Sequence, residues 1–340
     1  MDVSKLWCTV GDVRSVPTSR STPVVGIVLD DTHAVAAACA ASSVESYTAI
    51  EGPNVATNAA SLIRGVRRSD RVLLTVLSSQ VVTTRLPMST DMLDRVRFVH
   101  VATEAFVHGA ATGGLRSIDR VQTTGLLSDP SKVQAGRLAT ALAVRTPAVS
   151  AKQLHSWVSG AGQGRDVAQV CPAVLASGSN DKLVVIVASA TTAIMYSAQG
   201  QPLCFSTVPG GGLREVAGRL GSDGEARLRN VWAGGGGDPV AQFEVRTLAE
   251  TVASDVRRTV NGLHADGYPV AADVVVVCNL GVGVLLSAAL EDVGFSPQPP
   301  PKPPGVPLPE QLSGLAWLAA QVGLGAPRFG TSATLAQVKT

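Results

Sequence analysis

Residues 183–213 constrain the fold of this chain more than any other stretch: LVVIVASATTAIMYSAQGQPLCFSTVPGGGL. The opening apolar run, residues 183–187, is β-branched and too short for a capped helix, so it predicts a buried strand. A tight Ser/Ala/Thr turn leads to a second strand. Gln199-Gly200 then supplies a hairpin turn, because glycine adopts a positive φ at little cost in free energy. A third strand ends in a Gly-rich turn, and residues 213–220 continue as an amphipathic helix. We therefore expect three meandering strands followed by a helix.

The same pattern of a buried strand, a turn and a returning strand also occurs near the start of the chain. Residues 24–29 (VVGIVL) predict a buried strand, residues 30–33 a turn, and residues 34–40 a returning strand. Helical spacing follows over 54–67, and residues 72–77 and 81–87 predict two strands that neighbour each other in a sheet. Two α/β units, each headed by a hairpin, predict a duplicated topology.

Composition shifts along the chain divide it into six expected segments. They are a polar N-terminal lead-in (1–23), a first half (24–109), a small α/β insert (110–180), a second half (181–296), a Pro-rich linker (297–310), and a C-terminal helix returning to the core with a tail (311–340). Within the second half we expect an exposed glycine-rich loop (221–239), a long helix (243–263), a buried strand (273–278) and a helix (284–293).

Composition also excludes several classes of protein. The chain has 340 residues, enough for about two domains, and 45% of them are hydrophobic against 16% charged. A net charge of +2 without a long basic block gives no indication of nucleic-acid binding. Five dispersed cysteines without C-x-x-C spacing indicate free thiols in a reducing compartment. No signal segment and no apolar stretch of the ~20 residues that a bilayer span requires is visible, so we expect a cytoplasmic protein.

Four stretches, in this order and spacing, resemble the PilM family, the actin-like cytoplasmic proteins of type IV pilus and related secretion machines. They read RVLLTVLSSQVVTTRLPMS, AVRTPAVSAKQLHSWVSGAG, AQGQPLCFSTVPGGGLREVAGRL and LAETVASDVRRTVNGL. The resemblance covers roughly residues 24–330, and the third stretch is its most specific part. It implies an α/β actin-like ATPase (ribonuclease H-like) duplicated fold, with two lobes and a small α/β insert domain in the first half.

The sequence departs from the family at both hairpins. The two positions that are usually acidic in the family hold Val28 and Ile186, and two glycine positions hold Asp30 and Ala188. Phosphoryl transfer relies on backbone N–H groups near the phosphates and on a carboxylate that anchors Mg²⁺. Asp30 would instead repel a phosphate by roughly 1–4 kcal/mol, depending on the local dielectric. The alternative is that Asp30, on the same strand face as Val28, holds a metal in place of the missing acid.

Nine residues fall where the resemblance implies a nucleotide site. They are Asp30, Thr32, Ser189, Thr191, Gly210, Gly211, Gly212, Gly281 and Gly283. The cofactor implied there is ATP with Mg²⁺, and no catalytic residue and no separate metal site is assigned. The glycines have an alternative reading, because Gly-rich segments also form strand-to-helix turns without any ligand.

The resemblance implies a scaffold of a type IV pilus or related secretion machine, and the departures at both hairpins predict weak or no ATP hydrolysis. Its implied partner is the cytoplasmic tail of an inner-membrane PilN-like protein, with self-association or ring formation as a further contact. Its implied location is peripheral, at the inner face of the cell membrane, reached only through the partner. The alternatives are an active ATPase or small-molecule kinase of the same superfold, and a structural protein of an actin-like filament.

Overall fold

The structure is a computed structural model, and it describes fourteen segments of the chain. These are residues 23–30, 33–40, 42–51, 55–67, 70–77, 82–89, 119–126, 138–147, 167–169, 182–198, 201–232, 238–278, 282–309 and 313–325. The expected lead-in (1–23) falls almost entirely outside these segments, as does a helix that helical spacing predicts over 89–108.

The first half is built on a five-stranded sheet in the order β3-β2-β1-β4-β8. Its strands are β1 (Val24–Leu29), β2 (His33–Ala40), β3 (Ser43–Glu51), β4 (Arg71–Val76) and β8 (Val167–Gln169). The first three form an antiparallel meander, and β4 and β8 extend the sheet in parallel. Helix α1 (Val55–Gly65) connects β3 to β4, as its helical spacing predicts.

The second half repeats this topology. Its sheet runs β11-β10-β9-β12-β13, with another antiparallel meander extended by two parallel strands. The strands are β9 (Leu183–Val187), β10 (Thr192–Ala198), β11 (Gln201–Val208), β12 (Asp273–Cys278) and β13 (Ser296–Gln298). Strand order and direction match position by position between the two sheets, so the duplicated topology predicted from the patterns is confirmed.

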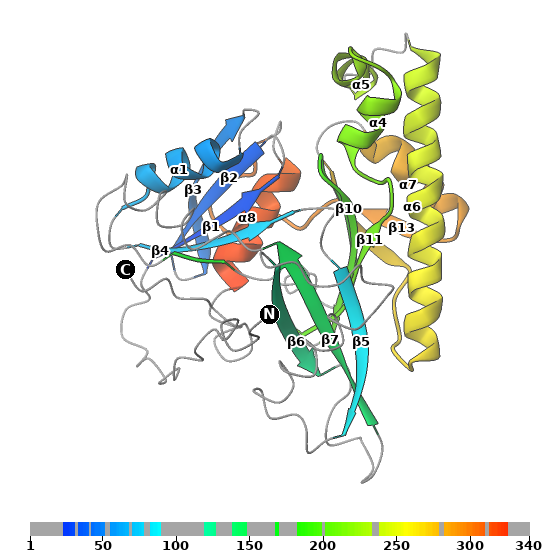
Figure 1. Ribbon diagram of the computed structural model, residues 1–340, viewed down its shortest axis with the longest axis horizontal. Helices are drawn as coiled ribbons and strands as arrows, with labels where there is room; N and C mark the ends of the chain where they lie inside the picture. The colour runs from blue at the N-terminus through cyan, green and yellow to red at the C-terminus, as the bar shows by residue number, and fades with distance from the viewer. Residues whose placement is uncertain are drawn as a thin grey trace, which may run out of the picture.

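A separate three-stranded antiparallel sheet lies beside strand β11 (Figure 1). It consists of β5 (Val82–Ser89), β7 (Leu138–Pro147) and β6 (Asp119–Leu126), in that order. The prediction that residues 81–87 neighbour the strand at 72–77 is wrong, because β5 pairs along its whole length with β7. The residue patterns at 72–77 and 81–87 each predict a strand, but neither pattern specifies which strand it pairs with. The segment boundaries at 109 and 180 stay predictions.

Five helices complete the second half and the end of the described chain. They are α4 (Leu213–Arg219), α5 (Gly224–Trp232), α6 (Pro239–Ala265), α7 (Val282–Asp292) and α8 (Ser313–Gly325). The expected loop over 221–239 is in part the helix α5, a correction to the glycine-based prediction. None of the helices described in these segments is long and apolar enough to cross a bilayer.

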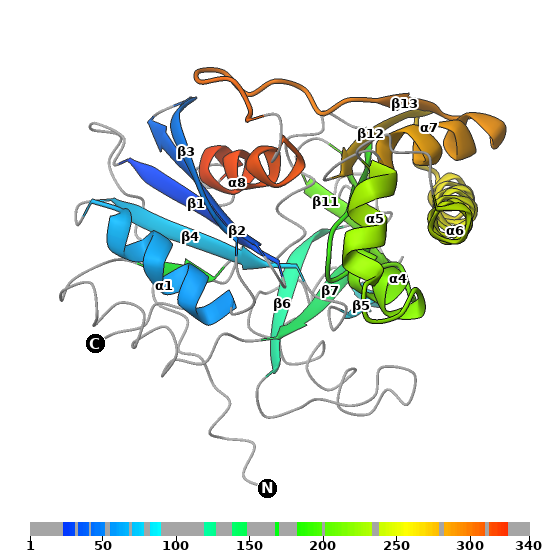
Figure 2. The same ribbon diagram turned by 90° about the horizontal axis from the view of Figure 1, so that it is seen from above.

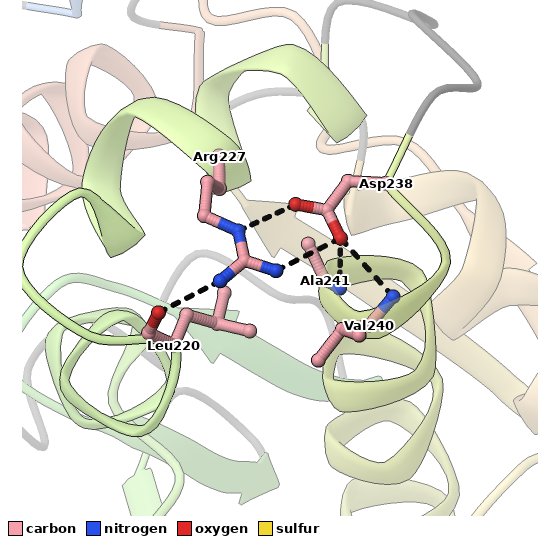
Figure 3. Close-up of polar contacts among 5 residues, drawn as sticks. All are labelled: Leu220, Arg227, Asp238, Val240 and Ala241. Carbon is pink, nitrogen blue, oxygen red and sulfur yellow. Dashed lines mark hydrogen bonds and ion pairs between the residues drawn. The ribbon is translucent and has the colours of Figure 1, made fainter.

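Helix α6 begins at a charged cap (Figure 3). The Asp238 carboxylate accepts hydrogen bonds from the backbone N–H groups of Val240 and Ala241, at 3.1 and 3.0 Å. Arg227 of α5 donates to both oxygens of the same carboxylate and, through Nη1, to the carbonyl oxygen of Leu220. One aspartate therefore caps α6 and fastens α5 beside it.

Helices cover both faces of the first sheet. Figure 2 shows α1 on one face and α8 on the other. Ile27 and Ile63 belong to the core under α1, whereas Val28 belongs to a larger core that also contains Ile186 and Trp317. Helix α8 is buried almost all round, as expected of a helix enclosed by two packed layers. The two halves therefore share one hydrophobic core through α8.

The Pro-rich stretch after β13 is joined to the first half, although its composition predicts only an extended linker. The backbone N–H of Val44 donates to the carbonyl of Pro304 at 2.8 Å, and the N–H of Val306 donates to the carbonyl of Val44 at 3.0 Å. Gly305 lies between these two bonds with φ +104°. Residues 304–306 thus bond to strand β3 before the chain enters α8.

Candidate functional site

The turns that follow β1 and β9 occupy equivalent places in the two halves. The N–H of Asp30 donates to the carbonyl of His33 at 2.8 Å, and the N–H of Ala188 donates to the carbonyl of Thr191 at 3.0 Å. In each half the bond closes the turn between the first and second strands. Asp30 and Ala188 are therefore structural counterparts.

The carboxylate of Asp30 crosses from the first turn to the second. Its Oδ2 accepts the backbone N–H of Ser189 at 2.8 Å, and its Oδ1 accepts the backbone N–H of Ala190 at 2.9 Å. The partners are 159 and 160 residues away in sequence. Asp30 is 1% exposed, so this charged contact lies inside the protein at the junction of the two halves. Two adjacent backbone N–H groups that converge on one anion form the kind of donor pair that binds oxyanions in proteins.

The Gly-rich turn before α4 packs directly on the turn between β9 and β10, residues 188–191. The N–H groups of Leu213 and Arg214 donate to the carbonyls of Ala188 and Ser189 at 3.2 and 3.0 Å, and the next two N–H groups of α4 donate to Gly212. A Cβ on Gly212 would lie 2.7 Å from the carbonyl oxygen of Ala190. These N–H groups all have partners within the chain, so close packing of the turn accounts for the glycine.

The other two glycines of this turn serve its geometry as well. Gly210 has φ +66°, which strongly favours glycine. A Cβ on Gly211 would lie 2.9 Å from the Val208 side chain. The carbonyl of Gly211 accepts a hydrogen bond from the Thr192 hydroxyl at 2.5 Å. Neighbouring Thr191 is 3% exposed, and its hydroxyl donates to the carbonyl of Thr192 at 3.4 Å. The hydroxyls of both threonines are thus engaged with the backbone.

The remaining predicted site residues lie elsewhere or outside the described segments. Gly283 is in the first turn of α7, where a Cβ would lie 3.1 Å from the sulfur of Cys278. Burial raises the pKa of the Cys278 thiol to about 11. Thr32 and Gly281 lie outside the described segments. The structure thus brings Asp30, Ser189 and Thr191 together with the Gly210–Gly212 turn, and the nucleotide-binding role predicted for these residues stays a prediction.

The chemistry of this junction suits a magnesium–phosphate group poorly. The N–H groups of Ser189 and Ala190 already bind a carboxylate, and a phosphate there would meet the charge of Asp30. Val28 and Ile186, for which the resemblance to the PilM family led to an expectation of acidic residues, are apolar and are 0% and 1% exposed within the shared core. Among the described residues, no cluster of three or more His, Cys, Asp or Glu side chains has the arrangement of a metal site.

Two residues at the junction escaped the sequence analysis, Ala190 and Thr192. Ala190 contributes a backbone N–H, and Thr192 contributes the hydroxyl that holds the Gly-rich turn. Ala188 was noted in the sequence, but its carbonyl, which accepts the Leu213 N–H, was not foreseen. The residue type does not show which backbone groups take part, so neither alanine signals this role. Thr192 could have been noticed as a polar residue at the start of a largely apolar strand.

Comparison with known proteins gives likeness in structure alone. No family model matches the sequence, and no curated protein matches it. Among solved structures, the chain is similar to the PilM-PilN type IV pilus biogenesis complex, with TM-score 0.62, 15% identity, and coverage of 91% of this chain and 99% of that one. It also matches the ethanolamine utilization protein EutJ from Carboxydothermus hydrogenoformans, with TM-score 0.46, 13% identity and 94% of each chain covered.

A further match is the cytoplasmic domain of EpsL, an inner-membrane component of the type II secretion system of Vibrio cholerae. Its TM-score is 0.43 at 9% identity, with 89% of this chain and 95% of that one covered. Identities this low bear on the fold only. The TM-score of 0.62 over nearly the whole length, together with the duplicated strand order, shows that the chain has the actin-like fold.

Proposed function

We propose that this protein is an actin-like scaffold of a type IV pilus or related secretion machine, and that it works without hydrolysing ATP. The observation that carries the proposal is the pair of hydrogen bonds from Ser189 and Ala190 to the Asp30 carboxylate. In an actin-like ATPase the junction between the halves must offer donors and a metal to a nucleotide. In this chain the donors are bound by the chain's own carboxylate.

The partner we propose is the cytoplasmic tail of an inner-membrane PilN-like protein. The sequence stretches that resemble the PilM family support it, as does the similarity of the fold to a PilM-PilN complex. A short tail bound in extended form would gain affinity from main-chain hydrogen bonds and selectivity from side-chain pockets. Such binding would place the protein at the inner face of the membrane without a span of its own. Self-association, also implied by the resemblance, belongs to the same proposal.

The test is direct binding of a labelled peptide. The peptide is the N-terminal cytoplasmic tail of the PilN-like protein encoded in the same genome, and fluorescence anisotropy follows its titration with the full-length chain. We expect saturable binding whose dissociation constant is the same with and without Mg-ATP. A scrambled peptide of equal composition is the control. Equal binding of both peptides, or none, would contradict the proposed partner.

A further inference from the structure

We infer that the Ser189–Ala190 turn is an oxyanion-binding site and that its resident ligand is the carboxylate of Asp30. The chain thus carries its own anion at the junction of its halves, where it holds the two turns together. The inference deepens the proposed function and rests on it in one respect: the junction operates without a nucleotide.

The contact geometry supports a dedicated anion site. Each carboxylate oxygen receives one N–H, at 2.8 Å and 2.9 Å, from two consecutive residues. Hydrogen bonds to an ionised acceptor are shorter and roughly twice as strong as neutral ones. A carboxylate that is 1% exposed depends on such donors, because an unpaired buried charge is very costly.

The duplicated topology shows that the contact runs in one direction. Ala188, the counterpart of Asp30, has a methyl group where Asp30 has a carboxylate, so the second turn cannot reach back in the same way. Its carbonyl instead accepts the N–H of Leu213. The first turn therefore supplies the anion and the second turn supplies the donors, a division of roles that a symmetric pair of turns would lack.

The ligand class follows from the donors. Two consecutive N–H groups, each bonded to a different oxygen, match two oxygens of a planar carboxylate or of a tetrahedral oxyanion. Removing the Asp30 side chain would take away the acceptor of a buried N–H at Ala190 and of a partly buried N–H at Ser189. It would also leave space that a small oxyanion can fill. Formate, the smallest carboxylate, is the matching probe, and inorganic phosphate probes the tetrahedral class.

The experiment is chemical rescue of the full-length Asp30→Ala variant. Urea unfolding is followed with and without sodium formate, with sodium chloride keeping the ionic strength constant. We expect formate at about ten times its dissociation constant to lower the unfolding equilibrium constant of the variant about tenfold, and to leave the wild type unchanged. An equal response of the wild type and the variant would overturn the inference.

Asp238→Ala is the matched control. Asp238 also accepts two backbone N–H groups, from Val240 and Ala241, but at a partly exposed helix end within the second half. We expect this variant to lose stability without recovering it in formate. Recovery of both variants to the same degree would show a general anion effect and would contradict a site specific to the junction.

Hydrogen exchange provides a readout that survives poor folding of the alanine variant. In wild type we expect slow exchange of the Ser189 and Ala190 amides. In Asp30→Asn, one side-chain oxygen can still accept an N–H while the amide nitrogen cannot, so exchange of one of the two amides should rise selectively. Unchanged protection of both amides in Asp30→Asn would overturn the inference. These readouts do not depend on peptide binding, so a failure of the proposed partner would leave them intact.

Discussion

A Cβ atom placed on Gly26 would lie 2.4 Å from the backbone nitrogen of Gly323, because strand β1 and helix α8 meet backbone to backbone. The same atom would lie 2.2 Å from the carbonyl oxygen of Ala319. Gly323 is packed as tightly, since a Cβ there would lie 2.5 Å from the sulfur of Cys39. The two glycines thus seat α8 on the first sheet, and α8 carries the wholly buried Trp317 into the shared core.

The first prediction concerns this contact. Gly26→Ala should lower the free energy of unfolding by about 1–3 kcal/mol, because backbone atoms that cannot move locally must make room for the methyl group. Urea unfolding monitored by circular dichroism measures the change. The control is Gly262→Ala within α6, where a Cβ meets nothing within 4 Å, and it should stabilise by about 0.5–1 kcal/mol. A Gly26→Ala variant as stable as wild type would refute the close packing of α8.

A second prediction concerns the bonding of residues 304–306 to β3. Gly305 has φ +104°, and a Cβ there would lie 2.1 Å from the carbonyl oxygen of Val44. Gly305→Ala should therefore cost more than the roughly 1–2 kcal/mol of a left-handed residue alone, and it should speed hydrogen exchange of the Val44 amide. Gly294→Ala is the matched control, because Gly294 has φ +91° with nothing within 4 Å of its Cβ position. Equal costs for the two variants would argue against the contact with β3.

Local patterns predicted much of the fold because its central strands are short β-branched runs. The residues of β1, β4, β9 and β12 are themselves mostly Val, Ile and Leu, which predicts buried strands. The repeated strand-turn-strand pattern likewise predicted the duplicated topology. Helix α5 was missed because its neighbourhood is rich in glycine.

What the sequence could not predict depends on contacts between distant segments. The pairing of β5 with β7 and the bonds of Val44 to residues 304–306 have no local signature. At the candidate site, Asp30 stood out in the sequence because the PilM family, which the sequence resembles, usually has a glycine at the matching position. The sequence pointed to repulsion of phosphate or to a metal, whereas the structure gives the carboxylate two backbone N–H partners 159 and 160 residues away.

A third prediction concerns acid stability. The Arg227 guanidinium holds the pKa of the Asp238 carboxyl well below its usual 3.8, and the N–H of Ala241 adds to the effect. Because the pKa of Asp238 is lower in the folded protein than in the unfolded chain, its ionised carboxylate stabilises the fold above pH 3.8. This stabilisation is lost as the pH falls below 3.8. Both Asp238→Asn and Asp238→Ala should therefore flatten the acid limb of the stability curve, measured by urea unfolding across the acid range.

At neutral pH these two variants should differ from each other. Asn can still cap α6, so Asp238→Asn should lose less stability than Asp238→Ala. An acid limb as steep in both variants as in wild type would contradict the assignment of this dependence to Asp238.

A fourth prediction concerns alkaline stability. Burial raises the pKa of the Cys39 thiol from its usual 9.0 to about 12, and burial raises the pKa of Tyr47 from 10.0 to about 12. Above pH 9 these groups ionise more readily in the unfolded chain than in the folded protein. The folded protein therefore keeps its full stability below pH 9 and loses stability as the pH rises toward 12. Cys39→Ala should therefore show a smaller drop in unfolding free energy between about pH 8 and about pH 11 than wild type. A drop of equal size would place the alkaline sensitivity elsewhere.

The central claim is that the junction of the two halves is closed by the chain's own carboxylate instead of by a nucleotide. Isothermal titration of the full-length wild-type protein with Mg-ATP, paired with a phosphate-release assay on the same sample, tests it most directly. The account predicts no saturable heat and no release of phosphate above the protein-free rate. Micromolar binding of Mg-ATP with measurable turnover would contradict it.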